Sequence, residues 1–485
     1  MNNARVVAGN LIWRFLERCG AQGVTFFVSI ILARLLDPEA YGTIALVTAF
    51  TSILQVFVDS GLGTALIQKE NADDLDFSSV FYCNVIVCSL LYLGMFFLAP
   101  TIAFFYDNEE LISIIRVISL IIIISGVKNI QQAYVSRNFL FKKFFFSTLG
   151  GTVVAAVAGV LLAYKGYGVW ALVWQLVLNN AVDTLVLWIT VPWRPVKQFS
   201  FDRLKVLFIY GWKLLVSSLM DALYTDVRQL IIGKMYSSSD LAQYNRGRTF
   251  PYLIVVNVNS SIDSVLFPLM ASEQLCKEKI REIARKSIII STYIIAPVMI
   301  GLITISKPLV RLLLTEKWIP CVPFMVIFCI TFMIYPIHTA NLNAIKAMGR
   351  SDLFLKLEMI KKSVGLLSLF ITMWFGVLPM AYSLLFTSLC SQVINSYPNK
   401  RLLDYGFMDQ IKDVLPIIGL SVLMGVIIWP IQYFGMADLV TVFLQVFAGV
   451  LVYFICSRVF NIYPYVYLLE TIKRYSTKQK NRSMK

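Results

Sequence analysis

The sequence predicts an all-α polytopic membrane protein with about 14 transmembrane helices, in two six-helix lobes related by pseudo-two-fold symmetry and followed by two extra helices. Apolar residues make up 58% of the 485 residues and charged residues only 15%, whereas soluble domains have about 45–50% and about 25%. Several apolar runs exceed the ~18 residues that indicate a membrane-spanning helix. This composition excludes a soluble enzyme and a disordered protein.

Fourteen apolar stretches are each close to the ~20 residues that a ~30 Å hydrocarbon layer requires. They lie at residues 11–35, 41–62, 78–104, 111–134, 144–164, 166–191, 207–233, 241–272, 288–305, 319–341, 357–375, 377–398, 414–433 and 439–460. The first eight residues lack the charged start and cleavage site of a signal peptide, so we expect the first span to be retained. The connections are too short for an extramembrane catalytic domain.

Lys and Arg residues predict how the chain is oriented. They gather in the N-terminal segment, in the even-numbered connections and in the tail, whereas the odd-numbered connections hold few. Under the positive-inside rule this asymmetry places both termini in the cytoplasm. It also accounts for most of the formal net charge of +15, so we expect the tail to contact anionic membrane lipids and expect no nucleic-acid partner.

Polar residues recur with the same spacing on one face of the first and seventh spans. The matching residues are Arg14, Arg18, Gln22, Thr25 and Ser29 in the first span, and Lys213, Ser217, Asp221, Tyr224 and Arg228 in the seventh. We call these two series the polar stripes. Trp13 and Trp212 precede the two series by the same distance. Secondary transporters built from parallel repeats bind their substrate between the two halves.

The recurrence predicts four regions along the chain. A six-helix unit occupies residues 1–198 and is repeated at 199–400. Two extra transmembrane helices follow at 401–460, and a basic cytoplasmic tail occupies 461–485.

The charged residues within the spans indicate an anionic substrate. A charge at mid-bilayer costs about 2.5–3.5 kcal/mol, so each is expected to face a partner or a watery cavity. Basic residues outnumber acidic ones there, and Arg suits diphosphate because its planar group binds two oxygens at once. The predicted substrate-binding residues are Arg14, Arg18, Lys213, Arg228, Arg246 and Arg248, and the candidate ion-coupling residues are Glu17, Asp59 and Asp221. Pairing of Arg14 with Glu17, and of Arg228 with Asp226, is the alternative within the bundle.

Four short blocks of the N-terminal half are distinctive. They are LARLLDP at 32–38 followed by Tyr41-Gly42, DSGLGTALIQ at 59–68, NFLFK at 138–142 and GYGVWALV at 166–173. In this order and spacing they resemble the Wzx-like lipopolysaccharide, colanic acid and teichuronic acid exporters of the multidrug/oligosaccharidyl-lipid/polysaccharide flippase superfamily. The resemblance covers residues 5–200 well, and the second half matches mainly in helix count and in the repeated stripe.

The resemblance implies a flippase and not an enzyme. Such a protein moves an undecaprenyl-diphosphate-linked oligosaccharide repeat unit from the cytoplasmic to the outer leaflet of the bacterial inner (plasma) membrane, for capsule, exopolysaccharide or O-antigen. It implies two six-helix lobes around a central cavity and alternating access without a cofactor, with H⁺ or Na⁺ as the coupling ion. Its partners would be the lipid-linked oligosaccharide, membrane lipids and other polysaccharide assembly proteins, and the two-lobe design works as a monomer. No family motif matches the cavity cations one to one, although Asp59 lies in a matching block.

Two other functions stay open on the sequence alone. A multidrug exporter of the same superfamily is disfavoured because a cavity for cationic drugs is expected to be acidic. A membrane polysaccharide polymerase or ligase usually carries a large outward loop, and this chain is expected to have none.

Two further signals are expected to be structural. Asp74-Leu75-Asp76 fits the DxD pattern of sugar-nucleotide transferases, but we expect it to be part of a solvated loop. His338, the single histidine, is expected to bond a backbone group and excludes any site that needs two histidines.

Overall fold

A computed structural model describes residues 2–59 and 61–466, and the side chains of residues 13–466 except 60 and 210. This part of the chain folds into α-helices and short 3-10 helices, with no β-strand in the ranges described. The predicted all-α class is therefore confirmed. From residue 467 on, the basic tail expected at 461–485 lies outside the described residues.

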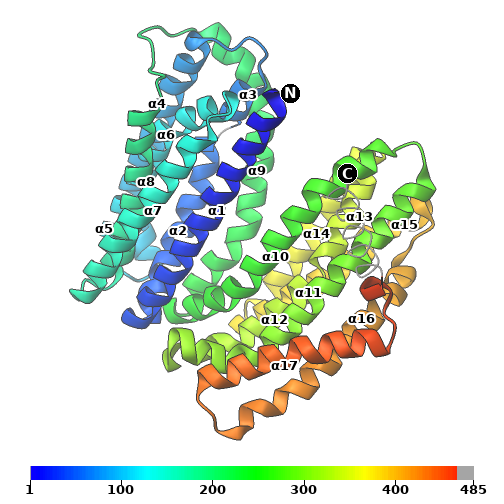
Figure 1. Cartoon of the computed structure of the whole chain (residues 1–485). Helices are drawn as coiled ribbons and strands as arrows, with labels where there is room; N and C mark the ends of the chain where they lie inside the picture. The colour runs from blue at the N-terminus through cyan, green and yellow to red at the C-terminus, as the bar shows by residue number, and fades with distance from the viewer. Residues whose placement is uncertain (1, 60, 467–485) are drawn as a thin grey trace. The chain divides into compact units, whose positions relative to one another are not determined.

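Packing divides the chain into two compact units, Met1–Ala242 (unit 1) and Gln243–Lys485 (unit 2). Unit 1 contains α1 (Asn2–Leu35), α2 (Pro38–Asp59), α3 (Leu62–Gln68), α4 (Asp74–Phe105), α5 (Glu110–Ile118), α6 (Leu120–Arg137), α7 (Phe141–Tyr164), α8 (Val169–Thr190) and α9 (Phe201–Met235) (Figure 1). Helix α10 (Ser238–Ser272) begins in unit 1 and continues in unit 2. Unit 2 further contains α11 (Lys277–Leu314), η1 (Glu316–Cys321), α12 (Val322–Met333), α13 (Tyr335–Ala347), α14 (Ser351–Thr372), α15 (Val377–Leu403), α16 (Phe407–Ile428), η2 (Trp429–Phe434) and α17 (Asp438–Val459).

The number of spans is close to the prediction. Twelve helices among the described residues are long and apolar enough to cross a membrane, or 13 if the two parts of α9, bent by 51° between Ile209 and Gly211, count as one span. The remaining predicted stretch, 357–375, coincides with α14, in which Lys356, Glu358 and the pair Lys361-Lys362 interrupt the apolar run. A multi-pass membrane protein follows from both counts.

Helix α9 packs with the helices that precede it in sequence, α2, α3 and α4. For this reason unit 1 extends to Ala242 and includes the linker 191–200. The lobe boundary expected at residue 198 rests on the repeated stripe and stays a prediction.

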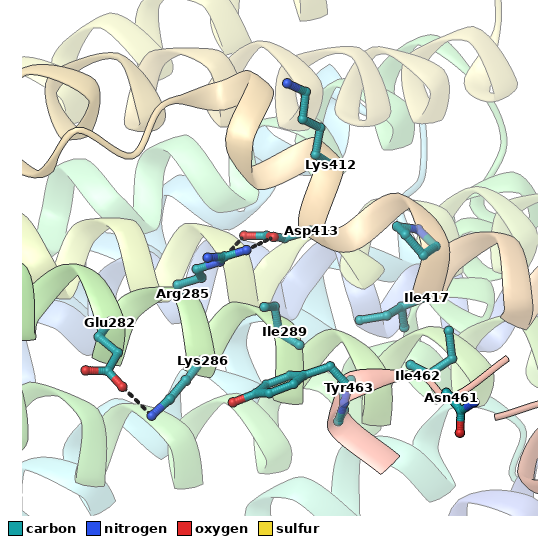
Figure 2. A pocket seen from close by; sticks show the side chains of 12 residues that line it. Glu282, Arg285, Lys286, Ile289, Lys412, Asp413, Ile417, Asn461, Ile462 and Tyr463 are labelled. Atoms are coloured by element: carbon teal, nitrogen blue, oxygen red, sulfur yellow. Dashed lines mark hydrogen bonds and ion pairs between the residues drawn. The ribbon is translucent and has the colours of Figure 1, made fainter. Parts of the chain in front are cut away.

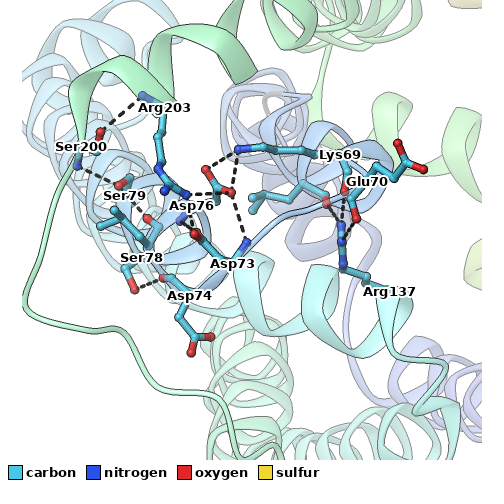
Figure 3. A network of polar contacts seen from close by, with 12 residues as sticks. Lys69, Glu70, Asp73, Asp74, Asp76, Ser78, Ser79, Arg137, Ser200 and Arg203 are labelled. Carbon is cyan, nitrogen blue, oxygen red and sulfur yellow. Dashed lines mark hydrogen bonds and ion pairs between the residues drawn. The ribbon is translucent and has the colours of Figure 1, made fainter.

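One end of unit 1, where the linker 191–200 lies, is held together by a polar network that we call the linker-end network (Figure 3). Asp73 caps α4 by accepting a hydrogen bond from the Asp76 backbone N–H at 3.0 Å. The Asp76 carboxylate accepts from Lys69 Nζ at 2.7 Å, and Arg203 Nη1 lies 3.5 Å from it. The start of α9 is thereby tied to α3 and α4 through Arg203, which also bonds Asp73 at 2.5 Å.

The DxD pattern is only partly a solvated loop. Asp74 is exposed, but Asp76 lies in the first turn of α4 and its side chain is fully buried. The expectation was wrong for Asp76. In the sequence it lies among other acids, but in the structure its carboxylate accepts hydrogen bonds from Lys69 and from the Asp73 backbone N–H at the start of α4, and these allow it to be buried.

Candidate functional site

The predicted stripe of α1 forms a polar face of unit 1. Arg18, Gln22 and Thr25 are exposed, and the Arg14 side chain is 39% exposed. Helix α1 packs on α7, where Trp13 contacts Phe145 with ring centroids 5.2 Å apart. An exposed polar face on a spanning helix suits a water-filled cavity better than lipid.

Arg14 and Glu17 form the ion pair that was the alternative to a free cation. Arg14 Nη1 donates to Glu17 Oε2 at 2.6 Å, and Thr148 Oγ1 on α7 donates to Glu17 Oε1 at 3.4 Å. The Arg14 guanidinium also lies 5.0 Å from the Phe144 ring centroid. Arg18, by contrast, makes no hydrogen bond or ion pair with any described residue, so its charge is available to a ligand.

The second stripe changes from exposed to buried along α9. Lys213 and Asp221 are exposed, whereas Arg228 is 7% exposed. Asp226, beside this stripe, is directed to α2, where Ser52 Oγ donates to its Oδ2 at 2.5 Å. The structure therefore presents Lys213 to its surroundings and packs Arg228 into unit 1.

The two cations of α10 differ from each other. Arg246 is 6% exposed and its guanidinium lies 4.9 Å from the Trp318 ring centroid, so it belongs to the interior of unit 2. Arg248 is half-buried and lies 4.8 Å from the Tyr252 ring centroid. Close packing causes the burial of Arg246, because a Cβ on the adjacent Gly247 would come within 2.7 Å of the Cys321 carbonyl oxygen.

Of the candidate ion-coupling acids, Asp59 is held by a neighbouring helix. Asn129 Nδ2 on α6 donates to Asp59 Oδ1 at 3.2 Å, although Asp59 is an exposed residue. Asp221 is exposed on α9, and Glu17 is buried at its pair with Arg14. The three acids thus sit in three different settings on α1, α2 and α9.

An ion pair inside unit 1 was not predicted. Lys128 Nζ on α6 donates to Asp183 Oδ2 at 3.1 Å and to Asn180 Oδ1 at 3.2 Å, both on α8. The two charged side chains are 13% and 12% exposed. The sequence does place two charges of opposite sign inside predicted spans, which favours a pair. However, 55 residues separate them, and the sequence does not show that the two side chains are close in space.

Unit 2 contains a buried network of uncharged side chains. His338 contacts Ser388 Oγ and Asn395 Nδ2, each at 3.3 Å, so its ring bonds side chains and not the expected backbone group. Nearby, Gln410 Nε2 donates to Asn341 Oδ1 at 2.8 Å. These contacts join α13, α15 and α16 and satisfy polar groups that lipid could not.

The chain is similar to proteins of polysaccharide biosynthesis. A family model described as polysaccharide biosynthesis protein matches residues 31–323. The chain is 26% identical over 316 residues to the succinoglycan biosynthesis transport protein ExoT of Rhizobium meliloti (65% of this chain and 64% of that protein). It is 24% identical over 305 residues to the teichuronic acid biosynthesis protein TuaB of Bacillus subtilis (62% and 63%). The chain thus spans a little under two thirds of the length of these relatives.

Solved structures share the fold. The lipid II flippase MurJ in an inward closed conformation matches with a TM-score of 0.75 at 14% identity, over 93% of this chain and 98% of that one. An inward-facing multidrug resistance transporter of the MATE family matches with a TM-score of 0.61 at 14% identity, over 83% and 98%. At these identities the likeness shows the architecture alone.

Proposed function

The chain belongs to the polysaccharide biosynthesis protein family, and we propose that it is a flippase that exports a lipid-linked oligosaccharide for a surface polysaccharide. The observation that carries this proposal is the match over residues 31–323, together with relatives named for succinoglycan transport and teichuronic acid biosynthesis. The MurJ-like fold supports it, because that fold also serves a lipid II flippase. The transported molecule would be an undecaprenyl diphosphate that carries an oligosaccharide repeat unit.

We propose that the protein lies in the bacterial inner membrane with both termini in the cytoplasm. The distribution of Lys and Arg supports this orientation. The linker-end network of unit 1 would then face the cytoplasm, as would the beginning of α1.

In the proposed mechanism the accessible cations receive the diphosphate. Arg18 and Lys213 are exposed and Arg14 is partly so, which supports their role in drawing the headgroup from the inner leaflet. On the outward side Arg248 is the more accessible cation, whereas Arg228 and Arg246 would have to leave buried positions to reach a ligand. Alternating access would carry the headgroup between the two sets while the lipid chain stays in the bilayer.

Coupling to H⁺ or Na⁺ would involve Glu17, Asp59 or Asp221. Glu17 is the acid whose surroundings favour a link to the substrate, because its 2.6 Å partner Arg14 also belongs to the proposed diphosphate site. A diphosphate that engages Arg14 would weaken this pair and leave Glu17 to bind a proton. Binding of the substrate at Arg14 would then promote binding of the ion at Glu17.

A reconstitution assay tests the proposal. The purified chain is placed in vesicles that contain a polyprenyl-diphosphate-linked oligosaccharide, and a glycosidase is added outside. In vesicles with the protein, the glycosidase should cleave nearly all of the lipid-linked sugar. In vesicles without it, the glycosidase should cleave only the sugar in the outer leaflet. Transport of cationic dyes with no movement of the lipid-linked sugar would instead favour a multidrug exporter.

A further inference from the structure

A cavity of about 580 Å³ lies in unit 2, where α11, α16 and the chain after α17 meet (Figure 2). It lies outside the polar stripes and plays no part in the proposed export mechanism. The lining residues are Glu282, Arg285, Lys286, Ile289, Lys412, Asp413, Pro416, Ile417, Asn461, Ile462, Tyr463 and Pro464.

The walls of the cavity are fixed by specific bonds. Arg285 binds Asp413 with two hydrogen bonds, of 2.8 Å from Nε and 2.7 Å from Nη2. Tyr405 Oη donates to the same carboxylate at 2.8 Å. On the other side Tyr293 Oη on α11 donates to Ser457 Oγ on α17 at 2.9 Å. Helices α16 and α17 are thus both fastened to α11, and the space between them is a built feature.

The third wall depends on a sharp end to α17. Asn461 adopts a left-handed conformation with φ of 47°, which Asn tolerates better than most residues. The Ile462 N–H then donates to the Ser457 carbonyl oxygen at 3.1 Å, and a new helical turn that contains Pro464 begins at Tyr463. The chain therefore turns back so that residues 461–464 close the cavity.

Helix α11 changes from charged to apolar beside the cavity. The first part of α11, residues 277–286, is rich in charge, whereas residues 287–306 carry none. Arg285 and Lys286 lie on one side of this change and Ile289 on the other. A charged mouth above an apolar base is the environment that a lipid headgroup and its first chain carbons require.

The charges leave one positive charge in excess. Of the two lining acids, Asp413 is occupied by Arg285 and Glu282 bonds Lys286 at 2.5 Å. Lys412 is exposed and makes no hydrogen bond or ion pair within the described part of the chain. A phosphodiester carries one negative charge, so this balance suits it better than it suits a diphosphate.

We propose that this cavity binds an anionic phospholipid of the adjacent leaflet. Its phosphate would lie at Lys412, and the first part of an acyl chain would contact Ile289, Ile417 and Ile462. The proposal does not depend on what the protein exports, so it stands or falls separately from the flippase function.

Native mass spectrometry of the purified full-length protein tests the proposal, with phosphatidylglycerol as the probe. A basic residue near an anionic lipid surface contributes about 1 kcal/mol, so Lys412→Gln should weaken phosphatidylglycerol binding about fivefold. The matched control is Lys277→Gln, an exposed lysine of α11 outside the cavity, which should leave binding unchanged. Ile462→Trp, which fills the base without altering charge, should also reduce binding.

Three results would overturn the proposal. Equal losses in Lys412→Gln and Lys277→Gln would indicate diffuse attraction to lipid and no site. Displacement of phosphatidylglycerol by inorganic phosphate at equal concentration would show that no lipid chain is bound. Displacement by undecaprenyl diphosphate at lower concentration would identify a substrate lipid as the occupant.

Discussion

Asp76 illustrates how a single buried carboxylate stabilises the linker end of unit 1. Its side chain has no exposed surface and accepts hydrogen bonds from Lys69 at 2.7 Å. Asp76→Ala would leave the Lys69 charge without this partner, so we expect the free energy of unfolding to fall by about 3 kcal/mol. Asp74→Ala, two residues away on the exposed side of α4, should change it by less than about 0.5 kcal/mol. Equal effects in an unfolding titration would contradict the assignment.

Asp73 makes stability at this end depend on pH. The hydrogen bond from the Asp76 backbone N–H, and then Arg203, hold the pKa of Asp73 below its ordinary value. Because its pKa is lower when folded, Asp73 contributes stability above the unfolded pKa of about 4, and the contribution is lost as pH falls through the lowered value. The difference in thermal midpoint between the wild type and Asp73→Ala should therefore be constant near neutrality and shrink in acid.

The matched control for the pH effect is Asp73→Asn. Asn retains the cap of α4 but carries no charge, so its own midpoint should lack this acid-dependent loss. A difference between wild type and Asp73→Ala that stays constant down to pH 3 would contradict the lowered pKa.

Arg18 is the residue whose charge the proposed mechanism uses most directly. Arg18→Glu reverses an exposed charge that no described residue engages, so we expect normal expression and loss of surface polysaccharide. Lys165→Glu, an exposed residue in the connection between α7 and α8, serves as the control and should export normally. Normal export by the Arg18 variant would remove Arg18 from the substrate path.

The contacts of some of these charged residues could be predicted from the sequence, and those of others could not. Arg14 and Glu17 lie three residues apart on one helix, so their pairing was foreseeable. Lys128 and Asp183 lie in the predicted spans 111–134 and 166–191, but their bond depends on how α6 packs on α8. The burial of Arg246 likewise depends on a contact with η1 that no helical periodicity encodes.

At the scale of the element, the approach of α9 to α3 depends on glycine. Gly61 has φ of 67°, and a Cβ there would come within 2.5 Å of the Gly211 carbonyl oxygen at the bend of α9. Gly61→Ala should therefore cost more than the roughly 1–2 kcal/mol of left-handed strain. Gly166→Ala is the control, because Gly166 has φ of 80° but no atom within 4 Å of the added Cβ. Equal losses of unfolding free energy would show that α9 does not approach Gly61 this closely.

Helix positions were predicted well from apolar length, and helix divisions were not. The single stretch 111–134 is divided into α5 and α6, and 319–341 into η1, α12 and α13. The second stretch breaks beside Pro320 and Pro336, which cannot donate the backbone hydrogen bond of a helix interior. The first breaks at Ser119, and apolar length alone registers neither feature. Polar residues inside a predicted stretch do not end a helix either. Helix α14 continues through Lys361 and Lys362.

For the whole molecule, the membrane fold was predictable because a bilayer restricts a long apolar chain to helices of similar length. The family was also predicted from the blocks between residues 32 and 173, all of which lie within the matched region 31–323. The six-helix repeat and the cation cavity stay predictions, since the packing of each unit by itself does not test them.

The direct test of the central claim is the location of lipid-linked sugar in cells that lack the protein. The lipid extract is analysed for undecaprenyl-linked oligosaccharide, and its leaflet is determined with a membrane-impermeant reagent. We expect the oligosaccharide to accumulate on the cytoplasmic side while the surface polysaccharide disappears. Repeat units that reach the outer leaflet normally but stay unpolymerised would contradict the flippase.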